Sequence, residues 1–437
     1  MRNFIASGEV EAKMVCRYAD IRQKKNGGII MIGGPGACLI GKEEEKEILD
    51  VLHGGYLFRY GTEGEDGFQH KVVTFEKEMA ERLHQPYLFA TSSGTGALMC
   101  CLSALGVGAG DEVIVPGFTF IASIVSILLC NAMPVLAEID ESLNMDPTKL
   151  EALITPRTKA IMPVHMYGNP CDMDQIMGIA EKHKLYVIED CCQGVGASYK
   201  GRFLGTIGDM GAYSLNMYKT ITCGDGGFVG TANYDLYERA FGYHDQGHKP
   251  NRMGAEIGNR ALIGMNMRMN ELSGAVAVAQ GRKLFGIVET LRKNKKLLKA
   301  HLTGVPGIHF RKINDSGECA NVLTILFDTA AQAARFCAIT GLNTNANSGW
   351  HVYNNMEPVL YHRMASAANC PFDCPRFPTQ VELKRNMLPQ TDDILARSVN
   401  IGVGLVGSLV YGVSIRSTEG EILAAAERIA DAVRKSI

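Results

Sequence analysis

Between residues 112 and 190 the sequence alternates short β-branched runs with helical segments, and this alternation limits the folds open to the chain. The predicted strands are 112–116, 134–139, 160–164 and 186–189, and the predicted helices between them are 121–129, 147–153 and 173–182. Such alternation is typical of a mostly parallel sheet that helices cover on both faces. Ligands of these sheets bind beyond the carboxyl ends of the strands. The sequence therefore predicts an α/β fold with its site in the loops that follow the strands.

Length and composition indicate a globular protein with more than one unit. The chain has 437 residues, of which 46% are apolar and 21% are charged. That balance suits a substantial buried core, and the length allows two domains. A formal net charge of −2 gives no polyelectrolyte character, so neither nucleic acid nor an anionic membrane surface is an expected partner.

Cysteine usage and hydropathy predict a cytoplasmic protein. The thirteen cysteines are odd in number, several of them lie in apolar runs, and the N-terminus lacks the apolar stretch of a secretory signal. We therefore expect free thiols in a reducing compartment. The most apolar run, 118–129, is too short to cross a bilayer. Cys370 and Cys374 have no second ligand pair nearby, so a surface loop is expected there and no metal site.

Two glycine motifs look like nucleotide-binding loops, and the sequence argues against both. Residues 36–42 read Gly-x-x-x-x-Gly-Lys, but Glu43 stands where Ser or Thr should hold Mg²⁺, and two more glutamates follow. Residues 106–110 carry three glycines, but they lead into a strand instead of out of one. Neither stretch is expected to bind a nucleotide.

A lysine at the end of an apolar strand is the strongest sign of chemistry. Lys219 follows Ser214 by five positions and precedes a glycine-rich loop at 222–227. A lysine amine that is held neutral in a poorly solvated pocket forms Schiff bases with carbonyl groups, and glycines let the backbone approach a ligand closely. For this stretch alone, an ordinary lysine between a strand and a loop is an equal alternative.

Two other stretches complete a set of groups that suits pyridoxal 5′-phosphate (PLP). Residues 91–98 form a Ser/Gly/Thr-rich turn that opens a helix, whose free N–H groups can hold a phosphate or can simply be capped. Asp190 closes an apolar strand, where a carboxylate is costly unless it is paired. PLP requires a phosphate site, an amine for its aldehyde and a carboxylate for its pyridine nitrogen. The phosphate-binding turn, the lysine and the aspartate together indicate PLP more specifically than any one of them does alone.

On these and neighbouring stretches the sequence resembles the fold-type-I sugar aminotransferases of the DegT/DnrJ/StrS group. The matching stretches are 92–98, 110–116, 119–120, 164–168, 188–193, 214–227 and 264–269. The resemblance is close over about 34 to 290 and loose beyond. It implies a large PLP-binding domain at 34–295 with a mostly parallel seven-stranded sheet, and a small C-terminal α+β domain at 296–437. Residues 1–33 lie outside it and are expected to form an N-terminal arm.

The resemblance also implies a role for each matching residue. Lys219 would form the Schiff base with PLP and then move a proton, and Asp190 would pair with the pyridine nitrogen. The other implied cofactor residues are Gly94, Thr95 and Ser214 at the phosphate, Phe120 on the ring face and Gln193 at the ring hydroxyl. Asn266 would reach the phosphate bound in the neighbouring subunit, which implies a homodimer with shared sites. Cys192 and Asp225 depart from the usual Ala and Glu, but neither change removes a needed group.

By this resemblance the expected reaction transfers an amino group from glutamate to an oxo-sugar. Residues 55–61, 219–227, 245–248 and 353–355 resemble the branch that aminates the C8 aldehyde of a 3-deoxy-octulosonate for lipopolysaccharide biosynthesis. A nucleotide-sugar or cyclitol aminotransferase is the alternative, because these enzymes share most of the motifs. A PLP-dependent sugar dehydratase would carry histidine in place of the lysine, and a non-catalytic PLP-binding regulator would not need the complete set.

Three residues are candidates for binding the substrate. His165 follows a predicted strand, and His248 and Arg268 could each bind a substrate anion. A loop histidine and a helix-surface arginine are equal alternatives for His248 and Arg268.

Overall fold

The computed structural model of the protein describes residues 33–437 except 62–63, 66, 251–257, 259, 366–367, 378–380 and 405–409. The predicted N-terminal arm, 1–33, lies outside the described residues apart from its last position. In the described part of the chain, no helix is both long enough and apolar enough to cross a membrane.

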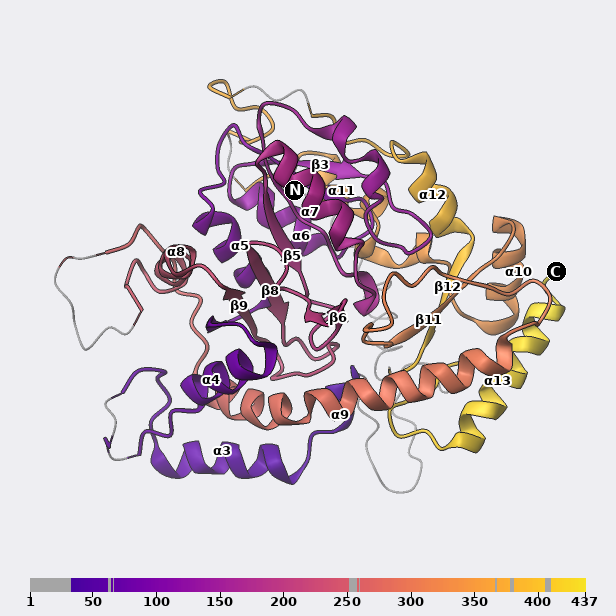
Figure 1. Cartoon of the computed structure of the whole chain (residues 1–437), viewed down its shortest axis with the longest axis horizontal. Helices are drawn as coiled ribbons and strands as arrows, with labels where there is room; N and C mark the ends of the chain where they lie inside the picture. Colours follow the sequence, from indigo (N-terminus) through magenta and orange to yellow (C-terminus); the bar gives the residue numbers. More distant parts are fainter. Residues whose placement is uncertain are drawn as a thin grey trace, which may run out of the picture.

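A seven-stranded sheet forms the centre of the molecule, as predicted (Figure 1). In spatial order its strands are β1 (Tyr87–Thr91), β9 (Gly227–Thr231), β8 (Met210–Ser214), β5 (Tyr186–Asp190), β4 (Thr158–Ile161), β2 (Glu112–Pro116) and β3 (Met133–Ala137). Only β9 runs against the others in this sheet. Every residue of β2 is buried, which is the reason that a continuous apolar run predicted this strand correctly.

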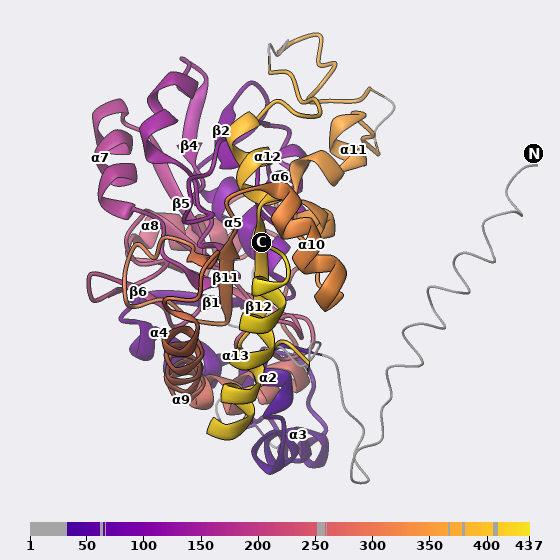
Figure 2. The same cartoon turned by 90° about the vertical axis from the view of Figure 1, so that its right-hand side faces the viewer.

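Helices cover both faces of the sheet, and the sheet separates the core into two clusters. One cluster involves α5 (Gly94–Ala104), α6 (Ile121–Leu129) and α8 (Tyr234–His244). The other involves α4 (Lys71–Leu83), α7 (Met173–His183) and α9 (Glu271–Leu302). Figure 2 shows α7 on one side of the molecule and the C-terminal helices α10 (Ala330–Thr340) and α11 (Glu357–Leu360) on the other, with α12 (Pro389–Ala396) between them in this view.

The C-terminal part contains a second, three-stranded antiparallel sheet. Its strands are β10 (His309–Phe310), β11 (Val322–Leu326) and β12 (Ser398–Gly402). The long helix α9 runs beneath the central sheet and packs against α3 (Lys42–Gly54), α4 and α13 (Glu419–Arg434) (Figure 1). The predicted boundary at 295–296 falls inside α9, which continues without a break to Leu302. One helix therefore supports both units.

Part of the C-terminal unit folds back onto the carboxyl ends of β2 and β3. The backbone N–H of Tyr353 donates to the carbonyl of Gly117 at 3.0 Å. Thr391 donates to Glu138 from its backbone N–H at 2.7 Å and from its hydroxyl at 2.6 Å. These contacts bring residues near 350 to the edge of the sheet where ligands of parallel sheets bind.

The predicted helical segment at 147–153 is present only as 3₁₀ geometry and not as a continuous α-helix. Residues Pro147–Lys149 and Glu151–Leu153 form two separate 3₁₀ turns. The segment ends at Thr155-Pro156, and a proline disfavours helical geometry in the residue before it. The remaining short elements are α2 (Pro35–Cys38), β6 (Ser198–Tyr199), β7 (Arg202–Phe203) and the 3₁₀ turns Met166–Gly168, Asn345–Asn347, Gly349–His351 and Tyr353–Asn355.

Glu271 connects α9 to the start of α4 and offers a test of this arrangement. Its buried carboxylate accepts the backbone N–H groups of Lys71 at 2.7 Å and Val72 at 3.0 Å. Glu271→Ala would leave both N–H groups without an acceptor, so we expect the free energy of unfolding in urea to fall by about 2 to 3 kcal/mol. Glu289→Ala, at an exposed position of the same helix, is the matched control and should change it by less than about 0.5 kcal/mol. Equal effects in the two variants would contradict this role.

Candidate active site

A cavity of about 450 Å³ opens at the carboxyl ends of the central strands. Seven of the residues predicted to bind cofactor or to act in catalysis line it: Gly94, Thr95, Phe120, Asp190, Gln193, Ser214 and Lys219. They come from the segments at and after the ends of β1, β2, β5 and β8, which are far apart in the sequence but meet at one edge of the sheet. The cavity is therefore built where the parallel strand topology predicts a ligand site.

The loop between β8 and β9 presents Lys219 to the cavity. Its backbone is closed by the hydrogen bond from the N–H of Lys219 to the carbonyl of Asn216 at 2.9 Å, and by the pairing of Asn216 with Gly224. Gly224 has a φ of 88°, in the region that favours glycine. The lysine side chain is half-buried, and it forms no ion pair with any residue in the described part of the chain. It is thus available to a ligand.

The glycines at 33–36, at and just before the start of the Gly-x-x-x-x-Gly-Lys motif, pack against the loop that carries Lys219. The N–H of Gly34 donates to the carbonyl of Met217 at 2.8 Å. A Cβ atom on Gly34 would lie 2.4 Å from the backbone of Tyr218. Glycine is required here because two backbone segments meet without room for a side chain.

The N-terminus of α5 and the end of β8 form one wall of the cavity. Ser93 caps the helix by accepting the N–H of Gly96 at 3.0 Å, while the N–H groups of Gly94 and Thr95 lie in the first turn, where they have no intrahelical partner. A Cβ on Gly94 would lie 2.7 Å from that of Ser214. The absence of a side chain at this position lets the Ser214 hydroxyl and the helix N-terminus come together, which suits a bound phosphate.

Asp190 faces the cavity from the end of β5 with no cation beside it. Its side chain is buried and accepts the hydroxyl of Ser123 at 2.7 Å and the N–H of Cys192 at 3.0 Å. Within the described residues it forms no salt bridge. A buried carboxylate without a positive partner is unfavourable. A cationic group of a ligand, such as a protonated pyridine, would compensate it.

Phe120 and Gln193 are placed to hold the sides of a flat ligand. Phe120 lines the cavity with 41% of its surface exposed, which is high for an aromatic ring in such a position. The side-chain carbonyl of Gln193 accepts the N–H of Tyr167 at 3.1 Å, so its amide NH₂ stays available for a ligand. The residues present therefore fit PLP at its phosphate, its ring face and its pyridine nitrogen.

The structure adds His351, which no local sequence signal identifies. It lies in a 3₁₀ turn of the C-terminal unit, lines the cavity, and has its ring centroid 5.2 Å from that of Phe120. Burial, together with the nearby Lys219 charge, lowers its pKa from the ordinary value, against the effect of the hydrogen bond to the Ser348 carbonyl. The ring is brought in by a contact between distant segments, in which the N–H of Thr119 donates to the His351 carbonyl at 2.9 Å.

Ser123 and Cys192 are two more cavity residues without an earlier assigned role. Ser123 was detectable in principle, because it lies in the predicted helix 121–129 shortly after Phe120 and is polar in an apolar run. Burial raises the pKa of the Cys192 thiol well above its ordinary value, so the thiol stays protonated. Cys192 thus adds bulk to the cavity but no charge.

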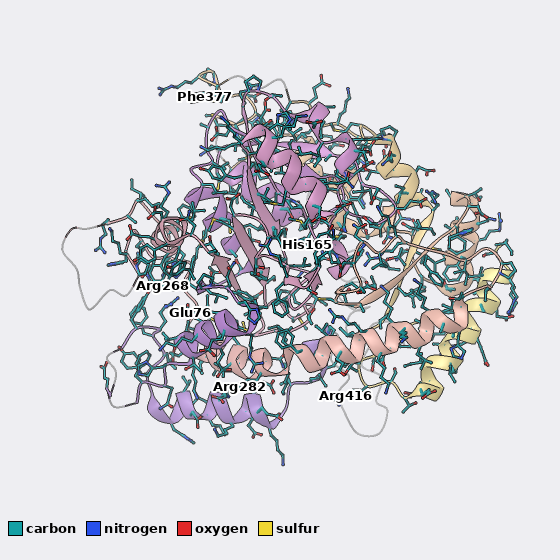
Figure 3. All side chains as sticks on the ribbon, in the orientation of Figure 1. Glu76, His165, Arg268, Arg282, Phe377 and Arg416 are labelled. Atoms are coloured by element: carbon teal, nitrogen blue, oxygen red, sulfur yellow. The ribbon has the colours of Figure 1, made fainter. Side chains whose placement is uncertain are left out.

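His165, which the sequence analysis predicted as a substrate residue, does not line the cavity of this chain. It is fully buried near the centre of the molecule (Figure 3). Its Nδ1 accepts the N–H of Cys171 at 3.0 Å, and its Nε2 lies 3.1 Å from Glu189. Burial acts to raise the pKa of Glu189, but the hydrogen bond from His165 and those from backbone N–H groups hold it below its ordinary value. The pair supports the strand that ends in Asp190.

Arg268, His248 and Asn266 also lie away from the cavity of their own chain. Arg268 pairs with the carboxylate of Asp245 and belongs to an extended segment, so it is not a helix-surface arginine. Figure 3 shows it well apart from His165. His248 contacts Arg260, and Asn266 is exposed. In this chain the three residues do not contribute to the cavity.

Comparison with known proteins agrees with the geometry. The chain belongs to the DegT/DnrJ/EryC1/StrS aminotransferase family, whose model matches residues 39–404. It is 45% identical over 210 residues to a GDP-perosamine synthase of Caulobacter vibrioides, covering 48% of this chain and 56% of that one. It is 39% identical over 245 residues to an L-glutamine:2-deoxy-scyllo-inosose aminotransferase of Streptoalloteichus tenebrarius, covering 54% and 57%. The chain thus spans little more than half the length of these curated relatives.

A solved structure extends the similarity over nearly the whole chain. NtdA of Bacillus subtilis, described with bound cofactor PMP, superposes with a TM-score of 0.67 at 26% identity and covers 93% of this chain and 87% of that one. The predicted family and fold type are therefore confirmed. The octulosonate branch suggested by the sequence motifs is not the activity named in these relatives.

The hydroxyl of Ser123 provides a test of how Asp190 is held. Ser123→Ala would remove a hydrogen bond to a buried carboxylate, which is worth about 1.5 to 3 kcal/mol. We expect the dissociation constant for PLP, measured by absorbance titration, to rise about tenfold or more. Ser126→Ala is the matched control, because Ser126 is buried on the same helix but donates to the carbonyl of Ser123 instead of to Asp190. A Ser123 variant with unchanged PLP affinity would contradict this assignment.

Proposed function

We propose that this protein is a PLP-dependent aminotransferase that transfers an amino group to an oxo-sugar. The observation that carries the proposal is the buried carboxylate of Asp190, which has no cation beside it and shares a cavity with the amine of Lys219. Family membership and a similar structure with bound PMP, the amine form of PLP, support the same cofactor.

Each residue of the cavity has a task in that reaction. PLP, when bound, supplies an aldehyde to carry the amino group and a ring that withdraws electrons from the substrate. Asp190 would accept a hydrogen bond from the ring nitrogen and keep it protonated, and Ser214 with the N-terminus of α5 would hold the phosphate. Lys219 would bind the aldehyde carbon covalently and, once its amine is displaced, would carry the proton to and from the substrate carbon.

For the acceptor, the relatives favour a nucleotide-linked oxo-sugar or an oxo-cyclitol over the octulosonate. Their names specify GDP-perosamine and 2-deoxy-scyllo-inosose. The second relative also names glutamine as its amino donor, so glutamine joins glutamate as a candidate donor here. A PLP-dependent dehydratase is disfavoured because the chain keeps Lys219.

We further propose that the active unit is a homodimer. Asn266 is exposed and lies outside the cavity of its own chain, as expected for a residue that would reach the phosphate in a neighbouring subunit. His248 and Arg268 would lie on the same shared side, where they could contact a substrate anion.

An amination assay with purified protein tests the proposal. We expect PLP to give a visible absorbance band, and glutamate or glutamine to bleach it and to support amination of a GDP-linked oxo-sugar. Lys219→Ala should lose the band and lower turnover by more than about a thousandfold, since the reacting amine is gone. Lys200→Ala, at an exposed lysine paired with Asp174, is the matched control and should behave like the wild type.

The assay also separates the competing functions. Amination of 2-deoxy-scyllo-inosose would identify a cyclitol enzyme, and amination of the C8 aldehyde of a 3-deoxy-octulosonate would restore the prediction from the sequence motifs. Release of water without consumption of the amino donor would indicate a dehydratase. Turnover that survives Lys219→Ala unchanged would refute the proposal as a whole.

A further inference from the structure

The proposed function gives Thr119 no task, although this residue stands directly before Phe120 and borders the cavity. Thr119 is fully buried, with an exposed fraction of 0%, and Ser123 and Asp190 are buried as well, with 1% and 4%. A buried hydroxyl has given up its hydrogen bonds to water. Its partners within the protein therefore determine what the hydroxyl of Thr119 contributes.

That hydroxyl begins a short chain of hydrogen bonds that leads to Asp190. The distance between Oγ1 of Thr119 and Oγ of Ser123 is 2.7 Å, and Oγ of Ser123 is in turn 2.7 Å from Oδ2 of Asp190. Both distances are typical of hydrogen bonds between oxygen atoms. Thr119 is thus connected to the carboxylate through one intermediate hydroxyl.

The direction of these hydrogen bonds follows from the carboxylate. When Asp190 is ionised, as the proposed function requires, it can only accept, so Ser123 donates its one hydroxyl proton to it. Thr119 must then donate to the oxygen of Ser123. A second acceptor, the carbonyl of Phe120, lies farther from the Thr119 hydroxyl at 3.4 Å. Hydrogen bonds in such a chain polarise one another, which strengthens each of them in a buried environment.

The C-terminal unit holds the backbone of Thr119 in place. The N–H of Thr119 donates to the carbonyl of His351 at 2.9 Å, and the preceding residue, Phe118, pairs with Val352 in an antiparallel bridge. Two consecutive residues of the loop after β2 are therefore fixed by a short strand-like contact. The hydroxyl is held toward Ser123 by a fixed backbone, as a preorganised site requires.

A helix cap is the ordinary structural explanation for a threonine near a helix start. Thr119 lies two residues before α6, and threonine often accepts an N–H group of the first helical turn. In α6, which lies wholly within the described residues, the N-cap residue is Phe120 and it makes no side-chain cap. The hydroxyl of Thr119 is directed to the side chain of Ser123 instead.

We propose that Thr119 is a positioning residue that acts through Ser123 to hold the carboxylate of Asp190 where it meets a ligand cation. The proposal rests on the proposed function, in which that cation is the protonated pyridine of PLP. The N–H of Cys192 holds the other carboxylate oxygen, Oδ1, at 3.0 Å. Thr119 and Ser123 thus set the position of Oδ2, and the C-terminal unit contributes to it through the backbone of Thr119.

A double-mutant cycle on PLP binding, measured by absorbance titration, tests this role. Thr119→Val replaces the hydroxyl by a methyl group of similar size, and we expect the dissociation constant for PLP to rise about threefold to tenfold, as for the loss of one hydrogen bond. Adding Thr119→Val to Ser123→Ala should cause no further rise, because the intermediate hydroxyl is already gone. Thr119→Ser keeps the hydroxyl and should bind PLP within about twofold of the wild type.

Thr231→Val is the matched control. Thr231 is buried at the end of β9 that lies away from the cavity, and its hydroxyl donates to the carbonyl of Asp209 at 2.8 Å. The variant loses a threonine hydrogen bond of the same kind in a different place. Its affinity for PLP should stay that of the wild type, even where its stability falls.

Urea unfolding of the cofactor-free proteins separates this proposal from the proposed function. Thr119→Val should lower the unfolding midpoint of the wild type and should lower that of Ser123→Ala less or not at all. Additive effects of the two substitutions, on PLP affinity or on the midpoint, would overturn the proposal, and so would unchanged PLP affinity in Thr119→Val. Wild-type protein that binds no PLP would refute the proposed function, while the coupling in urea would still decide whether Thr119 acts through Ser123.

Discussion

The candidate site depends on a carboxylate that the protein buries without neutralising. Asp190 receives two hydrogen bonds, from the hydroxyl of Ser123 and from the backbone N–H of Cys192. Neither supplies a positive charge. The protein therefore holds a buried charge that a ligand cation can compensate, and Lys219 lies in the same cavity with its amine free to bond to that ligand.

The sheet explains how Asp190 and the segment that carries Ser214 and Lys219 come together. β5 and β8 are adjacent and parallel, so Asp190 at the end of one strand and Ser214 at the end of the other emerge at the same edge. The buried pair of Glu189 and His165 fixes the strand from the opposite face, because Glu189 also accepts the N–H groups of Gly205 and Gly208. Asp190, which faces the cavity, and Glu189, which supports the strand, are thus consecutive residues whose side chains point to opposite sides.

The sequence predicted the parts of the site that follow directly from strand ends. Asp190 and Lys219 were identified because each lies where a predicted apolar strand meets a polar loop. His351 could not be identified in the same way, because a backbone contact with Thr119, far away in the sequence, brings it to the cavity. The position of His165 outside the cavity was not predictable, because the sequence places the residue after a strand but does not show which way its ring points. The direction depends on Glu189, a partner in the neighbouring strand.

The central claim is that the amine of Lys219 bonds to the PLP aldehyde in the cavity that contains Asp190. Borohydride reduction of the PLP-loaded protein followed by peptide mass mapping tests it most directly, because reduction fixes the cofactor on the lysine that holds it. We expect one modified peptide, and it should contain Lys219. Modification of a different lysine, or none on protein that has bound PLP, would contradict it.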